Sequence, residues 1–274
     1  MKEPDEIRRI LDVRSQRDFE ASHLRGAVNI PFEELSDRIH ELPASYVALT
    51  VFDVDSSRVQ AAAELLRARG RSDLVVHSGT DLLTDDNCEF GPDQGRLWSP
   101  HELLVRALET ARAEWNGLAG RCALDIACGT GRDAVFMAMN EMKVAAWDVL
   151  PDALERCRSL ASRNGVVIET DCRDVEREPS IPAGVFDLVT CFNFLHRPLM
   201  SAIAAAVRPG GFIVYETFLV EQRRLFGKPA SDNHLLKPGE LVGYFEGFDI
   251  LVSEERLASP RRFVASLIGR RRQC

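Results

Sequence analysis

LDIACGTGRD, residues 124–133, is the stretch of sequence that decides the fold of this chain. It begins as an apolar strand, crosses Gly129 and Gly131, and continues into a helix that we expect over residues 132–139. Because glycine has no Cβ, the backbone can approach a ligand closely there, and the unpaired amides of the helix N-terminus face the same place. The stretch therefore predicts a strand, a ligand-binding loop and a helix in succession.

On both sides of this loop the sequence alternates between strand-like and helix-like patterns. Ser99, followed by Pro100, is an expected N-cap for a helix that runs to about residue 115. Strands are expected at 122–127, 144–148, 166–170, 186–192, 211–217, 248–253 and 262–268. The last two have only a short connection, which favours an antiparallel pair at the sheet edge. The pattern predicts an α/β fold with a mostly parallel, seven-stranded sheet.

Asp148 ends the strand that follows the loop helix, nineteen positions after Gly129. A carboxylate at this place can accept hydrogen bonds from both hydroxyls of a ribose, so the spacing fits any adenosine-type cofactor. A nicotinamide- or flavin-dependent enzyme is a real alternative, because Gly129, Gly131 and Ala134 also satisfy the pattern G-x-G-x-x-G/A. The glycine loop alone leaves both possibilities open.

Two further acidic positions favour S-adenosylmethionine. Asp125 lies just before the glycine loop, where a carboxylate suits the positively charged amino-acid end of that cofactor and would repel a pyrophosphate. Asp171 and Cys172 follow the third strand, where a carboxylate can accept the adenine amino hydrogens and the next amide can meet a ring nitrogen. Together with the closing antiparallel pair, these positions indicate a methyl-donor site.

In order and spacing, several motifs resemble those of class I S-adenosylmethionine-dependent methyltransferases: LDIACGTGRD, Asp148, TDCRD (170–174), FDLVTCFNFLHR (186–197) and RPGGFIVYETF (208–218). The resemblance covers about residues 99–270, and residues 215–241 are further similar to the tellurite-resistance-type branch. It implies a Rossmann-like sheet of seven strands. The implied cofactor contacts are Asp125, Ala127, Cys128, Gly129, Gly131, Asp148, Val149, Asp171, Cys172 and the backbone around Phe192.

Methyl transfer from a sulfonium is an in-line displacement, so alignment and exclusion of water can suffice for a soft nucleophile. An amine or hydroxyl acceptor needs a group that takes its proton, and His196, Tyr215 and Glu216 are the candidates. His196 can equally be a structural residue. We expect a small-molecule acceptor. The alternatives are a NAD-dependent oxidoreductase and a non-catalytic module that senses the cofactor or binds a partner.

The N-terminal region contains ILDVRSQRDFEASHLRGAVNIP, residues 10–31, which resembles the opening of a rhodanese domain. Rhodaneses place a nucleophilic cysteine in a loop between a buried strand and a helix that carries an arginine. The corresponding loop here is FDVDSSRVQAAAELL, residues 52–66, and counting back from Arg58 puts Asp53 at the cysteine position. A carboxylate cannot accept sulfane sulfur, so we expect an inactive domain that serves as a scaffold, a self-association surface or a regulatory module.

Composition sets the domain limits and the remaining expectations. We expect a rhodanese-like domain at 1–82, a polar linker at 83–97 and the methyltransferase domain at 98–274. The net charge of -8 argues against nucleic acid as a partner. An N-terminus unlike a signal peptide, and the lack of 18 consecutive apolar residues, predict a cytoplasmic protein with no membrane partner.

The seven cysteines form no C-x-x-C pair and have no histidine at the spacing of zinc ligands, so we expect reduced thiols and no metal. They are Cys88, Cys122, Cys128, Cys157, Cys172, Cys191 and Cys274. Cys128, beside the glycines, is interpreted as a small packing residue because the loop needs close approach.

Overall fold

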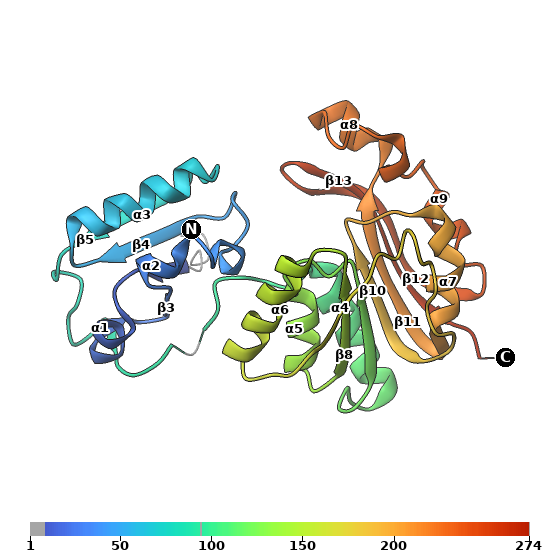
Figure 1. Cartoon of the computed structure of the whole chain (residues 1–274), viewed down its shortest axis with the longest axis horizontal. Coiled ribbons are helices and arrows are strands. Elements are labelled where there is room, and N and C mark those ends of the chain that lie inside the picture. Colours follow the sequence, from blue (N-terminus) through green and yellow to red (C-terminus); the bar gives the residue numbers. More distant parts are fainter. Residues whose placement is uncertain (1–8, 94, 274) are drawn as a thin grey trace, which may run out of the picture. The chain divides into compact units, whose positions relative to one another are not determined.

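The computed structural model describes residues 9–93 and 95–273. The chain divides into two compact units, residues 1–99 and 100–274. Figure 1 shows their helices and strands, and each unit is described by itself. In the part of the chain that the structure describes, no helix combines the length and the apolar character needed to cross a membrane.

The first unit is built on a four-stranded sheet in the order β3-β1-β4-β5, with every neighbouring pair parallel. Its elements are β1 (Arg9–Asp12), α1 (Gln16–Ala21), β2 (His23–Leu24), β3 (Ala27–Asn29), α2 (Phe32–Leu35), a short 3-10 helix (Ile39–Glu41), β4 (Leu49–Asp53), α3 (Ser56–Ala68), β5 (Leu74–Ser78) and β6 (Cys88–Glu89). Leu11 and Val51, from the two central strands, pack with Val59 and Leu66 of α3 in one apolar core. Parallel strands require such helical crossovers.

Within the segment 83–97, which we expected to be a linker, residues 88, 89, 93 and 97 contact this unit. Its short strand β6 pairs antiparallel with β2. The carboxylate of Asp93 accepts the backbone N–H of Asn29 at 2.9 Å, and Leu97 is buried in the apolar core. Two carboxylates of this polar segment, Glu89 and Asp93, thus accept backbone N–H groups of the first unit.

The second unit holds a seven-stranded sheet in the order β12-β13-β11-β10-β7-β8-β9. Its strands are β7 (Cys122–Ile126), β8 (Lys143–Asp148), β9 (Glu169–Cys172), β10 (Phe186–Phe192), β11 (Val207–Phe218), β12 (Phe248–Ser259) and β13 (Arg262–Arg271). The strands run parallel except β13, which is antiparallel to both β11 and β12. This confirms the expected fold class, including the antiparallel pair at the edge.

Helices cover both faces of that sheet and create two cores (Figure 1). They are α4 (Glu102–Trp115), α5 (Arg132–Met139), α6 (Pro151–Arg163), α7 (Met200–Ala206), α8 (Val220–Phe226) and α9 (Glu240–Gly243), with short 3-10 helices at Arg197–Leu199 and Asp232–His234. Leu188 and Phe192 of β10 face α4, α5 and α6, whereas Val189 and Cys191 face the core of α7 and α9. The alternation follows the two-residue period of a strand.

The strand order contains a switch point between β7 and β10. The chain proceeds from β7 outward to β8 and β9, and then returns to the other side of β7 to form β10. Loops that leave neighbouring strands in opposite directions open a crevice at the carboxyl ends, which is where ligands of open α/β sheets bind. The glycine loop leaves β7 at this point.

Candidate functional site

The glycine loop has three residues in the left-handed region: Ala127 (φ 55°), Gly129 (φ 55°) and Gly131 (φ 80°). Ala127 bears the strain that an L-residue meets there, about 1–2 kcal/mol. A Cβ added at Gly131 would lie 2.2 Å from the Sγ of Cys157, so this glycine permits close packing against α6. Around Gly129 no atom lies within 4 Å of an added Cβ. Gly131 therefore allows α6 to pack closely against the loop, whereas Gly129 leaves the space beside its backbone open.

Asp148 ties the glycine loop to the end of β8. Its Oδ2 accepts the backbone N–H of Gly129 at 2.8 Å, and its Oδ1 accepts the N–H of Leu150 at 2.9 Å. The side chain is largely buried. Each carboxylate oxygen has two lone pairs, so each keeps one acceptor position for a hydroxyl group.

Asp125 is a buried carboxylate with one unsatisfied oxygen. Thr190 Oγ1 donates to its Oδ1 at 2.8 Å, while Oδ2 has no hydrogen-bond partner among the described residues. Burial, followed by the nearby carboxylate of Asp133, raises the pKa of Asp125 well above its usual value of 3.8. A buried acceptor without a partner is costly. The arrangement therefore suits a ligand that brings a positively charged donor.

Asp171 and Cys172 lie side by side at the end of β9 but point to opposite faces. Asp171 pairs in register with Trp147, is about half exposed and forms an ion pair of 3.0 Å with Arg173. The Arg173 guanidinium lies 4.2 Å from the centre of the Trp147 ring. Cys172 pairs in register with Asp148, so these two residues share one face. The carboxyl ends of β8 and β9 thus lie next to each other in the sheet.

Val149 and Phe192 complete the set of expected contacts. The Sγ of Cys172 lies 3.7 Å from the carbonyl oxygen of Val149, whose side chain is exposed. Phe192 ends β10 and is buried. Asn193, the next residue, adopts a left-handed φ of 57° and donates its backbone N–H to the carbonyl oxygen of Glu216 at 2.8 Å.

His101 was not found from the sequence. The expected N-cap at Ser99 is wrong: α4 begins at Glu102, and Nδ1 of His101 accepts the N–H of Leu103 at 3.4 Å as its cap. The His101 ring stacks on Phe192, with centroids 4.1 Å apart and planes 8° from parallel. Histidine is an uncommon N-cap, so nothing in the local pattern distinguished it from the Ser-Pro pair beside it.

Glu216 is fully buried on the α4 face of β11. Its Oε2 accepts the hydroxyl of Ser266 at 2.6 Å, and its Oε1 lies 3.0 Å from Nε2 of His101 and 3.1 Å from the guanidinium of Arg262. Burial alone would raise the pKa of Glu216, but His101, Ser266 and Arg262 outweigh it and lower the pKa below its usual range. The carboxylate is held in its charged form, which makes it a weak base.

The other two candidate bases differ sharply in their surroundings. Tyr215 points to the opposite core from Glu216, is fully buried and donates its hydroxyl to the carbonyl oxygen of Phe194 at 2.8 Å. Burial raises the pKa of Tyr215 well above 10. His196 is partly exposed just beyond the end of β10, where its carbonyl oxygen accepts the N–H of Leu199.

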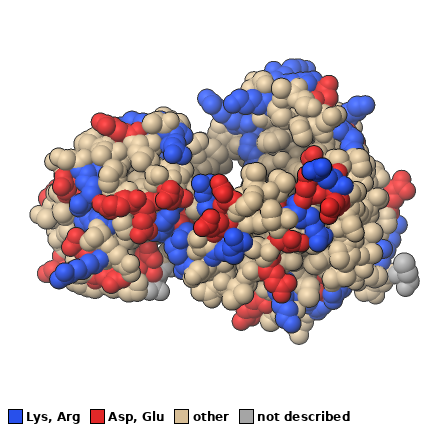
Figure 2. All heavy atoms as spheres, viewed as in Figure 1, with Lys and Arg blue, Asp and Glu red and all other residues tan. Residues whose placement is uncertain are grey.

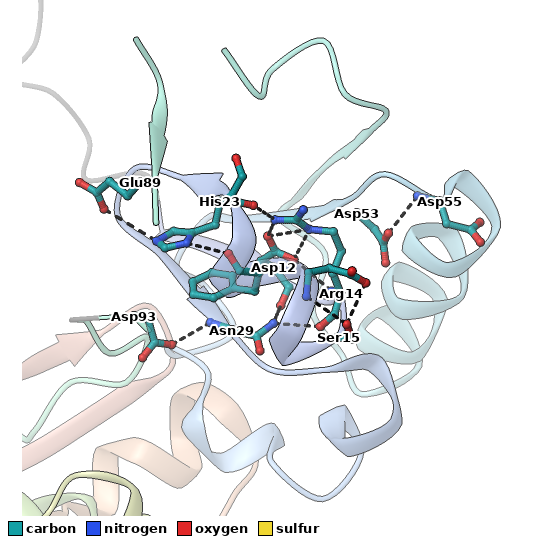
Figure 3. Close-up of polar contacts among 12 residues, drawn as sticks. Asp12, Arg14, Ser15, His23, Asn29, Asp53, Asp55, Glu89 and Asp93 are labelled. Atoms are coloured by element: carbon teal, nitrogen blue, oxygen red, sulfur yellow. Dashed lines mark hydrogen bonds and ion pairs between the residues drawn. The ribbon is translucent and has the colours of Figure 1, made fainter. Parts of the chain in front are cut away.

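In the first unit, Asp53 ends β4 and is fully buried (Figure 3). Its Oδ2 receives Nε of Arg58 at 2.5 Å, and its Oδ1 accepts the N–H of Asp55 at 2.9 Å. Asp55 in turn accepts the N–H groups of Ser57 and Arg58 at the start of α3. The N–H groups of Asp55, Ser57 and Arg58 are therefore bound by two carboxylates of the same loop.

The residues that suggested a rhodanese opening form a buried structural network (Figure 3). Asp12 and Arg14 make a buried ion pair of 2.6 Å. Asn29 donates its side-chain amide to the carbonyl oxygens of both, each at 3.0 Å. His23 is buried, with Nδ1 3.0 Å from the carbonyl oxygen of Phe19. These contacts give the residues of the motif a structural role and indicate no catalytic role for them.

Residues 9–93 and 95–273 contain no group of three or more His, Cys, Asp or Glu side chains placed to hold a metal ion.

Both units of the chain have matches among known protein families. A methyltransferase domain model matches residues 123–211, and a rhodanese-like domain model matches residues 1–80. A ubiquinone biosynthesis O-methyltransferase of Sodalis glossinidius is 34% identical over 172 residues, which are 56% of this chain and 69% of that protein. The chain belongs to the S-adenosylmethionine-dependent methyltransferases. Its second unit is called the methyltransferase unit below.

Two further similarities extend the comparison. An uncharacterized protein of Schizosaccharomyces pombe is 26% identical over 280 residues, covering 84% of this chain and 82% of its own length. This match is longer than either unit, so it includes residues of both. The crystal structure of TehB from Haemophilus influenzae superimposes with a TM-score of 0.51 at 16% identity, over 61% of this chain and 62% of that one. At this identity the likeness shows the fold.

Proposed function

We propose that the methyltransferase unit transfers the methyl group of S-adenosylmethionine to a small molecule at the carboxyl ends of β7, β8 and β10. The observation that carries the placement is the orphaned Oδ2 of Asp125, a buried acceptor near the carboxyl end of β7, just before the glycine loop. It suits the cofactor's ammonium group and opposes the pyrophosphate of a dinucleotide. This argues against the nicotinamide alternative on charge.

The residues present fit the cofactor on structural grounds. Gly129 offers open backbone, and Asp148 holds that backbone while keeping acceptor positions for ribose hydroxyls. We propose that the cofactor contacts come from Asp125, Ala127, Cys128, Gly129, Gly131, Asp148, Val149, Asp171, Cys172 and the backbone of Phe192. When bound, S-adenosylmethionine supplies a methyl group on a positively charged sulfur, which is reactive toward nucleophiles.

The residues of this chain must also align the methyl acceptor and, for an amine or hydroxyl acceptor, take up its proton. Contacts with His101, Ser266 and Arg262 lower the pKa of Glu216 and hold it in its charged form, and Tyr215 lies in the opposite core, so we assign the acceptor's proton to neither. His196 is the candidate base for an amine or hydroxyl acceptor because it is partly exposed beside the end of β10. A thiol acceptor would need no base.

Surface charge supports a small acceptor over a polyanion. Figure 2 shows Asp and Glu side chains interspersed with Lys and Arg over much of the displayed face. The net charge of the whole chain is -8. A surface of mixed charge on a chain with a negative net charge does not favour binding of the phosphate backbone of a nucleic acid.

Calorimetric titration tests the cofactor, and product analysis tests the reaction. We expect heat on addition of S-adenosylhomocysteine and none with NAD. Turnover of S-adenosylmethionine to S-adenosylhomocysteine is then measured against a panel of phenols, thiols, amines and carboxylic acids. Tight binding of NAD without any heat from S-adenosylhomocysteine would overturn the proposal. Binding without turnover on any acceptor would favour the non-catalytic alternative.

Cofactor binding is expected to release a proton from the methyltransferase unit. At pH values below its raised pKa, Asp125 carries a proton in the free protein, and this proton must leave before the carboxylate can meet an ammonium group as an ion. Affinity for S-adenosylhomocysteine therefore rises with pH up to that raised pKa and levels off above it. Stability has the opposite sign: it falls as pH rises from the usual value toward the raised one, because the folded state holds more protons.

Titration at one pH, in buffers that differ in ionisation enthalpy, counts the protons released. Asp125→Asn is the matched variant, since it keeps the size of the side chain and cannot titrate. Equal proton release by this variant and the wild type would show that another group is responsible.

We infer that the rhodanese-like unit has no sulfurtransferase activity through its loop and serves as an interaction or self-association module. The supporting contacts are those of Asp53 with Arg58 and of Asp55 with the start of α3. Wild-type protein treated with thiosulfate is expected to gain no sulfur atom by mass spectrometry. Asp53→Cys is expected to gain one, because Arg58 would then favour a thiolate at that position.

Arg58→Ala on the Asp53→Cys background is the companion variant and is expected to lower the extent of sulfur transfer. Persulfide on the wild-type chain, mapped by peptide analysis to any cysteine of the first unit, would contradict the inference of inactivity.

A further inference from the structure

We propose that His101 is a positioning residue for the methyl-donor site: it fixes the end of β10 and thereby slows release of the bound cofactor. The proposal rests on the cofactor site proposed above. His101 belongs to the short stretch before α4, and neither the sequence motifs nor the comparisons assign it a role.

His101 is in contact with four parts of the methyltransferase unit at once. Its backbone N–H donates to Oδ1 of Asp133 in the first turn of α5 at 2.6 Å. Its Nδ1 accepts the N–H of Leu103 in α4. Its ring stacks on Phe192 of β10, and Nε2 lies 3.0 Å from Oε1 of Glu216 on β11. The residue therefore joins the glycine-loop helix to the ends of two central strands.

A nitrogen that accepts the N–H of Leu103 carries no proton of its own, so the ring proton lies on Nε2. Nε2 lies 3.0 Å from Oε1 of Glu216, but no described residue accepts its proton with the geometry of a hydrogen bond, so this is a close polar contact. Rotation of the ring would lose the helix cap, the stacking on Phe192 and the contact with Glu216 together. The side chain is 13% exposed, so water does not readily replace these contacts.

Glu216 holds the same strand end through its backbone. Its carbonyl oxygen accepts the N–H of Asn193, the left-handed residue directly after Phe192. The side chain of Asn193 accepts a hydrogen bond from Arg262 at 2.6 Å, and Arg262 also contacts Glu216. The His101 ring thus stacks on Phe192, and Glu216 and Arg262 form hydrogen bonds with the next residue, Asn193.

Loss of the His101 contacts should therefore loosen the Phe192–Asn193 turn without removing any group that meets the methyl donor directly. Ligand contacts that depend on the backbone there would break more often. Loss of a helix cap together with a stacked aromatic pair is expected to change a rate about tenfold. We expect the effect in the dissociation rate, since most changes at a site appear there.

The experiment measures the dissociation rate of S-adenosylhomocysteine by stopped-flow fluorescence, using Trp147, which precedes Asp148. His101→Ala is expected to raise the rate about tenfold. His101→Phe keeps the stacking and loses the polar contacts, and His101→Gln can place an amide N–H near Glu216. We expect rates in the order Ala, Phe, Gln, wild type, from fastest to slowest. Rescue by glutamine is the readout that a merely structural role would not produce.

Glu114→Ala is the control, because it removes an ion pair of 2.8 Å with Arg270 at the other end of α4. Its dissociation rate should equal that of the wild type. Melting temperatures of all variants are measured in parallel, and the phenylalanine and glutamine variants retain a side chain of similar bulk should the alanine variant unfold. Lower melting temperatures with unchanged dissociation rates would overturn the proposal, as would equal rates for Gln and Ala.

Asp148→Ala separates this proposal from the one on which it rests. Loss of binding in Asp148→Ala, combined with wild-type rates in the His101 variants, would refute only the role of His101. Wild-type binding by Asp148→Ala would instead refute the cofactor site itself.

Discussion

Asp148→Ala is expected to weaken the binding of S-adenosylhomocysteine by about 100-fold or more. The carboxylate has two roles that fail together: it holds the N–H groups of Gly129 and Leu150, and it offers acceptors for two ribose hydroxyls. Each hydrogen bond to a charged group contributes about 1.5–3 kcal/mol, so the loss of two accounts for the expected factor. Isothermal titration measures it directly.

Asp152→Ala is the matched control for Asp148→Ala. Asp152 is an exposed carboxylate in the first turn of α6, four positions further along the chain. The control variant should bind S-adenosylhomocysteine as the wild type does. A similar loss of affinity in both variants would indicate a general effect of charge, and full binding by Asp148→Ala would remove this residue from the site.

Gly131→Ala is expected to destabilise the methyltransferase unit by about 3 kcal/mol. A left-handed conformation costs an L-residue about 1–2 kcal/mol, and overpacking of a filled core costs about 1–3 kcal/mol more. The added Cβ would lie 2.2 Å from Sγ, 2.8 Å from Cβ and 3.2 Å from Cα of Cys157, so α6 itself has to move. Urea denaturation gives the change in the free energy of unfolding.

Gly129→Ala isolates the conformational part of that cost. Gly129 has the same sign of φ, and an added Cβ meets no atom within 4 Å. It should lose only about 1–2 kcal/mol. Cys157→Gly combined with Gly131→Ala should show a favourable coupling in a double-mutant cycle, because the two side chains compete for one space. Equal losses for the two glycine variants would contradict the steric argument.

Much of the fold was predictable because its signals are local. The order of strands and helices, the glycine loop and the acidic residues at strand ends are properties of short segments, and the comparisons confirm the methyltransferase and rhodanese-like families that these segments indicated. The segment 83–97 shows the limit of composition. Its polar residues look like a linker, yet β6 and Asp93 find partners about 64 positions earlier in the chain.

The candidate bases show why strand patterns alone were insufficient. Tyr215 and Glu216 are neighbours in β11, so they must point to opposite faces. Because β11 is buried on both faces, its sequence has no polar-apolar alternation that says which face meets the site. Only the packing of α4 on one side and α7 on the other decided it.

By itself, the sequence determined the glycine loop, the placement of Asp125 and Asp148 around it, and the absence of a cysteine at Asp53, since each depends on residue type and spacing along a few neighbouring positions. The tertiary structure alone decided that Gly131 makes room for Cys157 while Gly129 stays open, and that His101 lies on Phe192 against Glu216. These contacts join residues 26 to 115 positions apart, and no local pattern encodes which distant side chains will fill the same space.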